Sequence, residues 1–410
     1  MVAVYKLKER SMRRFGPGLL VTAAFIGPGS VATASMAGAN YGFVLLWALA
    51  FSLLATAVLQ EMSARLGLVS SSGLAQALRT TFQHPIVSKL AVILIVAAIG
   101  IGNAAYEAGN LSGAALGLSQ ISGLSLSVSA ILLGAITALL LGTSGYKLIE
   151  PVLVLLVITM SGIFLLTLFL VDVDYSALIS GLLVPSIPPG SALTIIALIG
   201  TTVVPYNLFL HANLVQEKWH GVDKITALRE SRVDTAVSIG LGGLITLAIM
   251  STSAVAFFNT DRMFSASSIA VQLEPVLGAS ANLFFAAGLM AAGLTSAITA
   301  PLAAAYAVSG AMGWPSDFSD RRFRLVWMVV LAVGTLFATM GAKPIVAIIF
   351  AQAANGLLLP IVAIFLLLVM NRSDLLGDHR NGTIANIVGG LIVAVVASLG
   401  VFKIFQLFLN

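Results

Sequence analysis

The chain consists of long apolar stretches separated by short polar loops. Its 410 residues are 59% hydrophobic and only 9% charged, with a mean hydropathy of +1.04, whereas a soluble domain is about 25% charged. Apolar stretches near the roughly 20 residues that cross a bilayer must satisfy their backbone internally, as helices. The pattern predicts an all-α integral membrane protein with eleven transmembrane helices. The expected spans are 15–39, 42–66, 86–117, 124–146, 149–171, 190–216, 233–258, 279–311, 325–342, 344–370 and 384–408.

Basic residues indicate how the chain is oriented. With the N-terminus in the cytoplasm, 18 of the 21 Lys and Arg residues fall in cytoplasmic segments, and only Arg262, Lys343 and Lys403 fall outside. The positive-inside rule favours this arrangement. We therefore expect a multi-pass protein of the inner cell membrane, in contact with membrane lipid, with its C-terminus outside. The net charge of +5 does not indicate nucleic-acid binding, because the basic residues lie in short loops.

Three other features exclude particular classes of site or segment. The chain contains no cysteine, which excludes disulfides, thiolate metal sites and cysteine nucleophiles. The start of the chain is charged and the first span contains Gly-Pro-Gly, so we expect no cleavable signal peptide. No phosphate-binding loop or paired carboxylates are evident, so we expect neither an enzyme nor a bound cofactor.

Two of the apolar stretches are interrupted in the middle by residues that break helices. The first interruption runs from Ala24 to Ser30 (AFIGPGS), and the second from Thr201 to Asn207 (TTVVPYN). Paired interruptions at matching places in two halves of a chain indicate the binding site of a secondary transporter. A channel would instead show a filter-like loop.

The spacing of the interruptions predicts the domain organisation. Residues 1–410 form a single transmembrane transporter domain, with a first repeat at about 15–171, a second at about 190–370 and an extra helix at about 384–408. Because five spans make each repeat, the second is inverted relative to the first. This is a leucine-transporter-like 5+5 inverted repeat with discontinuous helices 1 and 6.

Several strings resemble the NRAMP (natural resistance-associated macrophage protein) family of proton-coupled divalent-metal transporters. Gly16-Pro17-Gly18 leads into the first interruption, and the string from Val204 to Gln216 (VPYNLFLHANLVQ) is the most specific match. The region around Gln352 in span 10 is also similar. The resemblance covers spans 1 to 10 and implies divalent-cation import, with Mn²⁺ or Mg²⁺ as the expected substrate and H⁺ as the coupling ion.

The chain departs from the family pattern at the metal site itself. The family's Asp-Pro-Gly-Asn in span 1 has become Gly-Pro-Gly-Ser, with Gly27 at the aspartate and Ser30 at the asparagine. The family's Met-Pro-His-Asn in span 6 has become Val-Pro-Tyr-Asn, with Val204 at the methionine and Tyr206 at the histidine. Most of the side chains that a transition-metal carrier would use are therefore missing.

The expected substrate site, for a metal or any other solute, lies where the two interruptions meet. Its donors would be neutral backbone carbonyls, hydroxyls and amides. An isolated dication is costly to bury among such donors, but Mg²⁺ keeps its waters readily. The alternative is a small organic acid or amino-acid-like solute, held at the positive ends of the half-helices. The candidate residues are Ile26, Gly27, Gly29, Ser30, Val203, Tyr206, Asn207 and Gln352.

Ionisable residues inside a membrane are functional hypotheses by default. Glu107 lies deep in span 3, on a polar stripe with Asn103 and Asn110, and could relay a proton or ion or could simply join helices. His211 could move a proton or bond a neighbouring helix. Na⁺ is a less favoured coupling ion, because hydroxyls in membrane helices usually bond neighbouring helices. Its candidate ligands are Thr295, Ser296 and Thr299.

Overall fold

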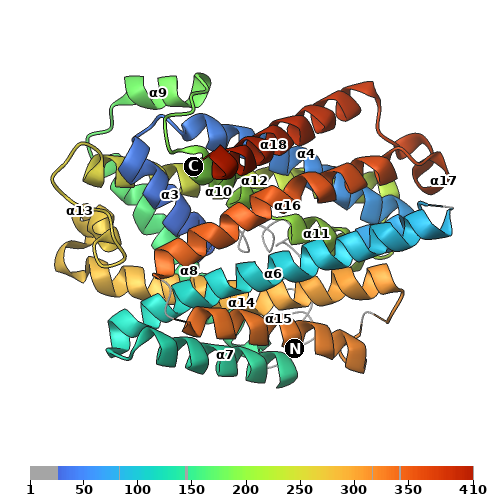
Figure 1. Cartoon of the computed structure of the whole chain (residues 1–410), viewed down its shortest axis with the longest axis horizontal. Coiled ribbons are helices and arrows are strands. Elements are labelled where there is room, and N and C mark those ends of the chain that lie inside the picture. Colours follow the sequence, from blue (N-terminus) through green and yellow to red (C-terminus); the bar gives the residue numbers. More distant parts are fainter. Residues whose placement is uncertain (1–25, 83, 144–145, 316, 341–342, 410) are drawn as a thin grey trace, which may run out of the picture.

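The computed structural model describes residues 26–82, 84–143, 146–315, 317–340 and 343–409, and within these ranges every regular element is a helix (Figure 1). Ten of the described helical segments are long and apolar enough to cross a membrane. The first expected span, at 15–39, is described only from residue 26 onward, and its described helix is α3 (Pro28–Tyr41). The helices of the ten segments are α4 (Leu46–Ser70), α6 (Pro85–Ser122), α7 (Leu126–Thr143), α8 (Tyr146–Leu170), α10 (Ala192–Thr202) together with α11 (Pro205–Lys218), α12 (Lys224–Phe257), α14 (Ala281–Met312), α15 (Arg321–Thr339), α16 (Pro344–Met370) and α18 (Thr383–Leu409).

One long helix extends well beyond the span expected from hydropathy. The expected span 233–258 is the second part of α12, which begins at Lys224. Asp223 caps this start, since its carboxylate accepts the backbone N–H of Thr226 at 3.1 Å. The charged first turns continue the helix beyond the apolar stretch, so a window based on hydropathy misses them.

Short helices occupy several of the connections. They are α5 (Leu74–Arg79), α9 (Tyr175–Leu183), η1 (Ile269–Leu273), α13 (Glu274–Leu277), η2 (Gly278–Ser280), α17 (Ser373–Leu376) and η3 (Gly377–His379). In Figure 1, α9 and α13 lie at one end of the molecule and α17 at the other. The connection between the two expected repeats, from Val171 to Gly190, contains α9, which Asp174 caps by accepting the Ala177 N–H at 3.0 Å.

Small residues bring the central helices into close contact. A Cβ at Gly293 of α14 would overlap Ala114 and the Asn110 backbone of α6, and one at Gly200 of α10 would overlap the backbone of α16 at Gly356. Figure 1 shows α6, α14 and α16 running alongside one another through the body of the protein. Membrane helices associate through small residues in this way.

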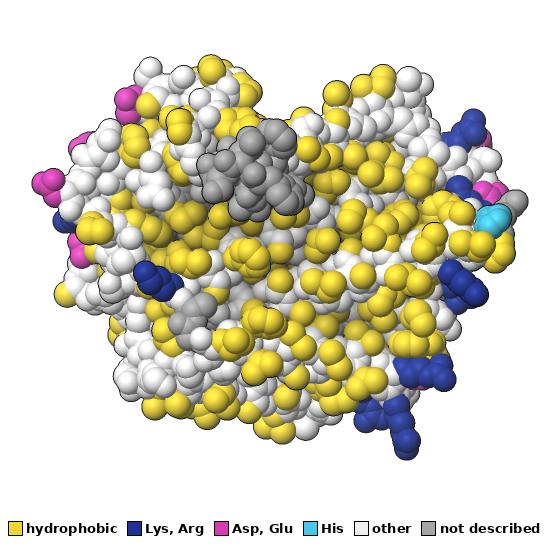
Figure 2. Space-filling model, viewed as in Figure 1, with side chains coloured by type: hydrophobic (Ala, Val, Ile, Leu, Met, Phe, Trp, Pro, Cys, Tyr) yellow, Lys and Arg dark blue, Asp and Glu magenta, His cyan; other side chains and the backbone are white. Residues whose placement is uncertain are grey.

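The outer surface is apolar along its length and charged at its ends. Figure 2 shows hydrophobic side chains across the middle of the visible face and most of its Lys and Arg side chains at the right end. Exposed residues such as Leu139, Leu155 and Phe169 lie on the helix faces. This distribution fits a multi-pass membrane protein whose flanks contact lipid.

Candidate functional site

The first interruption begins helix α3 at a proline. Gly27 precedes it in an extended conformation (φ −104°, ψ −174°), and Pro28 occupies the first helical turn. Proline suits this position, since the N–H that it lacks would have no partner in the helix. The backbone N–H of Val31 then donates to the Gly27 carbonyl at 3.2 Å. Because residues 1–25 lie outside the described part of the chain, only this second half of helix 1 can be described.

The second interruption separates α10 from α11 and confirms the predicted discontinuity of helix 6. Helix α10 ends at Thr202, Val204 is extended (φ −76°, ψ 117°), and Pro205 opens α11. The Val203 N–H still bonds the Ile199 carbonyl at 2.8 Å. Two non-helical residues therefore separate the half-helices, and at this point the regular hydrogen-bond ladder stops.

The two interruptions meet in the interior. The hydroxyls of Ser30 on α3 and Thr201 on α10 are 3.0 Å apart and buried. A Cβ at Gly29 would overlap the amide of Gln352 on α16, and one at Gly113 on α6 would overlap the ring of Pro28. Four helices, α3, α6, α10 and α16, thus converge on one point. Of the candidate site residues, the structure thus places Gly29 against Gln352 and Ser30 against Thr201.

Two buried amides at the interruptions lack hydrogen-bond partners: Gln352, which meets Gly29, and Asn207, in the first turn of α11. Both polar atoms of Asn207 and both of Gln352 have no partner among the described residues, and the two side chains are 1% and 0% exposed. A buried polar group left unpaired costs about 1–3 kcal/mol. Side chains in this state are available to bind a ligand. Ile26, Gly27 and Val203 are also buried at the interruptions, where the helix ladders end.

Two tyrosines pack together beside the interruption in helix 6. The rings of Tyr106 on α6 and Tyr206 on α11 meet edge to face, with centroids 5.3 Å apart, and both are fully buried. A cavity of about 190 Å³ lies nearby between α8, α11 and α14, with Leu210, Glu217 and Thr299 in its wall. At the position where the family pattern has histidine, this chain thus has Tyr206, whose ring packs into the interior.

Glu107 is fully buried between α6 and α15. Its Oε2 accepts a hydrogen bond from the Asn110 amide at 3.3 Å, and its Oε1 has no partner among the described residues. A Cβ at Gly334 of α15 would overlap the Glu107 side chain. Asn103, on the same predicted stripe, donates to the Ala300 carbonyl of α14 at 3.2 Å and thereby joins two helices.

His211, on α11, is fully buried and bonds a side chain of α4. Its Nδ1 is 2.7 Å from the side-chain oxygen of Gln60, and its Nε2 has no partner among the described residues. The sequence did not single out Gln60, although a lone amide in the apolar run of α4 was the available signal. The two relay candidates thus face different helices, α15 for Glu107 and α4 for His211.

The hydroxyls proposed as Na⁺ ligands are mostly bonded within their own helix. Thr295 donates to the Ala291 carbonyl at 2.8 Å and Thr299 to the Ser296 carbonyl at 3.2 Å. Only the Ser296 hydroxyl has no partner among these three side chains. This arrangement is the usual one for hydroxyls in membrane helices and gives no particular support to Na⁺ coupling.

The described part of the chain contains no group of three or more His, Cys, Asp or Glu side chains that could hold a metal ion. The oxygen donors near the interruptions are instead the hydroxyl of Ser30, the amides of Asn207 and Gln352, and backbone carbonyls. Such neutral oxygens suit a hard cation that retains part of its water shell. They do not form a site for a fully dehydrated soft metal.

Comparisons with known proteins agree with this architecture. The model of the "natural resistance-associated macrophage protein-like" family matches residues 18–406. The divalent metal cation transporter MntH of Chromohalobacter salexigens is 30% identical, with 96% of this chain and 91% of that protein covered. The protein of the same name from Staphylococcus aureus strain Newman is 28% identical, with 98% and 92% covered.

Solved structures support the same fold. A manganese transporter of Eremococcus coleocola, in complex with an aromatic bis-isothiourea substituted compound, superposes with a TM-score of 0.75 at 22% identity, covering 95% of this chain and 85% of that one. MhsT in complex with L-phenylalanine gives a TM-score of 0.60 at 16% identity, covering 94% and 98%. The predicted all-α, leucine-transporter-like fold is confirmed, and the family match over nearly the whole chain places this protein in the NRAMP family.

Proposed function

We propose that this protein is a secondary transporter that carries a divalent metal cation, Mg²⁺ or Mn²⁺, across the membrane by alternating access. The observation that carries the proposal is the pair of unpartnered amides, Asn207 and Gln352, buried where the interrupted helices converge. The relatives that bear the name divalent metal cation transporter support a cation as substrate. They also point to a transporter rather than an enzyme.

The chemistry of the donors favours a cation that keeps most of its water. Gly27 offers no carboxylate, and the Ser30 hydroxyl already lies 3.0 Å from Thr201. Amide and carbonyl oxygens can hydrogen-bond the water shell of an ion or replace one or two of its waters. Mg²⁺ gives up its waters reluctantly and needs few protein ligands, so it fits these residues better than a bare transition metal does.

The alternative of a small organic acid or amino-acid-like solute is less well supported. It rests on the positive ends of the half-helices at Pro28 and Pro205, and any transporter with this fold has such ends. MhsT, which binds L-phenylalanine in its structure, is only 16% identical, so its likeness concerns the fold alone. The relatives with the highest identities given above are named for divalent cations.

Protons are the proposed coupling ion, and Glu107 is the proposed relay. Its carboxyl is buried, retains an unpartnered oxygen and lies next in sequence to Tyr106, which packs on Tyr206 of α11. His211, bonded to Gln60, is the second candidate and would act on the α4 side. We also propose import with the N-terminus in the cytoplasm. Impermeant labelling of single introduced cysteines tests this orientation, since the chain has none of its own.

Calorimetric titration of Mg²⁺ and Mn²⁺ into the purified protein tests the site. Asn207→Ala and Gln352→Ala should weaken binding about tenfold or more, while the unfolding temperature of the unliganded protein stays the same or rises, because an unpaired buried amide is removed. Gln272→Ala is the matched control. Gln272 is equally buried, but it hydrogen-bonds Ser35 at 2.9 Å.

The control should therefore show the opposite result, a lower unfolding temperature with unchanged cation affinity. The proposal is wrong about these amides if both alanine variants bind the cations as tightly as the unmodified protein does. It is equally wrong if the Gln272 variant alone loses binding.

A further inference from the structure

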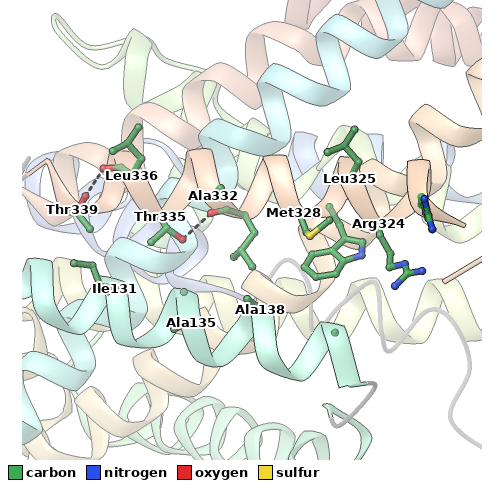
Figure 3. A pocket seen from close by; sticks show the side chains of 15 residues that line it. Ile131, Ala135, Ala138, Arg324, Leu325, Met328, Ala332, Thr335, Leu336 and Thr339 are labelled. Atoms are coloured by element: carbon green, nitrogen blue, oxygen red, sulfur yellow. Dashed lines mark hydrogen bonds between the residues drawn. The ribbon is translucent and has the colours of Figure 1, made fainter. Parts of the chain in front are cut away.

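A large groove opens on the outer surface between α7 and α15, away from the helix interruptions. Its volume is about 1270 Å³, which exceeds the roughly 300–1,000 Å³ of ordinary small-molecule pockets. Figure 3 shows Ile131, Ala135 and Ala138 of α7 facing Ala332 and Thr335 of α15 across it. Both helices are candidate membrane spans, so the groove lies along the flank that faces lipid.

Small residues create the groove. Gly134 packs directly against Thr335, where a Cβ would overlap the threonine side chain, and this contact sets how closely the helices approach. Beyond it, Ala135, Ala138 and Ala332 fill little of the space between the helices. At the far end, the Ser127 hydroxyl of α7 bonds the Thr339 carbonyl of α15 at 3.0 Å. The groove is therefore held at that end by a hydrogen bond between its two walls.

The threonine hydroxyls in the groove do not offer polar contacts. Thr335 donates to the Leu331 carbonyl and Thr339 to the Leu336 carbonyl, each at 2.7 Å, as Figure 3 shows by dashed lines. Hydroxyls that bond their own helix leave their methyl groups for packing. The body of the groove is thus mostly a lining for hydrocarbon. Apart from the arginines, the polar group that lacks a partner among its described lining residues is the buried indole N–H of Trp327.

The other end of the groove is basic. Arg321 and Arg324 line it there, three positions apart and hence on one helix face. Neither forms an ion pair with a described residue. Among these residues the guanidinium of Arg324 donates only to the Ser319 carbonyl, at 3.0 Å. The N-terminus of the 19-residue helix α15 adds the positive end of its dipole.

Nearby acids are engaged elsewhere. The Asp320 carboxylate accepts the backbone N–H groups of Arg322 and Phe323 at 2.7 and 3.3 Å. The Asp317 carboxylate accepts the Ser319 N–H at 3.0 Å, and this bond lowers the pKa of Asp317. Both carboxylates thus bond backbone N–H groups rather than the two arginines. The guanidinium groups of Arg321 and Arg324 remain available to an external anion.

We infer that this groove binds an anionic phospholipid, with an acyl chain along α7 and α15 and its phosphate between Arg321 and Arg324. The rise of α15 from Arg324 to Thr339 is about 22 Å, which is long enough for an acyl chain within a hydrocarbon core of about 30 Å. Guanidinium groups bind phosphate oxygens in a fork. The apolar lining suits the acyl chain of such a lipid, and the two arginines suit its phosphate.

Native mass spectrometry of the full-length protein, titrated with phosphatidylglycerol or with phosphatidylcholine of the same acyl chains, tests the inference. The unmodified protein should bind phosphatidylglycerol more tightly. Arg321→Gln with Arg324→Gln should weaken that binding about 25-fold, since each basic residue contributes about fivefold. Arg322→Gln is the matched control, because Arg322 lies over the Trp314 ring, 5.6 Å from its centroid, and does not line the groove.

A second pair of variants tests the apolar part. Ala138→Trp fills the groove and should reduce the binding of both lipids, whereas Leu139→Trp, at a 65% exposed neighbour on α7 that does not line it, should have no effect. Equal binding of the two lipids by the unmodified protein would overturn the inference. The inference would also be overturned if the double arginine variant bound phosphatidylglycerol as tightly as the unmodified protein does. A mass spectrum that showed a dimer with no bound lipid would overturn it as well.

Discussion

At the scale of single residues, Gly27 is the departure from the family pattern that removes a carboxylate from the proposed site. It precedes α3 in an extended conformation, and no side chain caps the helix there. Aspartate is among the best residues for this capping position, so the backbone of Gly27 already suits the acid that the family pattern places there. The fold therefore does not require the carboxylate to be absent, since this backbone is compatible with an acid at position 27.

Gly27→Asp should raise the affinity for Mn²⁺, because a carboxylate supplies the anionic ligand that a less hydrated cation needs. We expect a KM for Mn²⁺ at least about tenfold lower, corresponding to about 1.4 kcal/mol. Gly27→Asn is the control, since it caps the helix equally well without charge. Equal Mn²⁺ kinetics for the aspartate and asparagine variants in an uptake assay would place position 27 away from the substrate.

Glu107→Gln should remove the response of transport to pH while leaving the protein folded. Glutamine keeps the size of the side chain and can still bond Asn110, but it cannot exchange a proton. Cation uptake measured across a series of pH gradients checks this. Glu61→Gln is the control, because Glu61 is partly exposed and already ion-paired, with Arg232 at 3.0 Å and with Arg65 at 3.2 Å. A variant at position 107 that keeps the normal pH profile would make Glu107 structural.

The sequence could predict some of the site's residues but not their partners. Pro28 and Pro205 were evident because they interrupt apolar runs, and Glu107 because it is a lone buried acid. The bond from His211 to Gln60, the packing of Tyr106 on Tyr206 and the contact of Gly29 with Gln352 were not predicted. Each of these pairs joins different helices, and periodicity within one helix cannot reveal which faces meet.

At the scale of elements, the membrane helices were predicted closely and the connections were not. The spans expected at 344–370 and 384–408 became α16 (Pro344–Met370) and α18 (Thr383–Leu409). Apolar length alone determines such helices in lipid. Helix α9 and the first turns of α12 depend on capping by Asp174 and Asp223. These local polar contacts give no signal in a hydropathy profile.

The interruption between α10 and α11 should depend on Pro205. Pro205→Ala restores a backbone N–H that can bond the end of α10, which favours a continuous helix by about 1 kcal/mol. We expect transport to fall about tenfold with no loss of thermal stability. Pro85→Ala is the control, because Pro85 also opens a helix, α6, but is exposed and far from the site. Uptake by the Pro205 variant at the unmodified rate would show that the proline does not maintain the break.

At the scale of the whole molecule, the fold and the site support different conclusions. The scaffold of converging half-helices is common to transporters of several substrates, as the likeness to MhsT and to the manganese transporter of Eremococcus coleocola shows. The substrate must therefore be inferred from the residues at the convergence. The division into a repeat at about 15–171, a second at about 190–370 and an extra helix at about 384–408 remains a proposal.

The most direct test of the account is cation influx into liposomes that contain the purified protein. Mg²⁺ and Mn²⁺ uptake is measured beside a panel of labelled organic acids and amino acids, with protein-free liposomes as background. The account predicts divalent-cation influx above background, with Mg²⁺ carried at least as well as Mn²⁺, and no uptake of the organic compounds. Uptake of an organic compound without cation flux would contradict it.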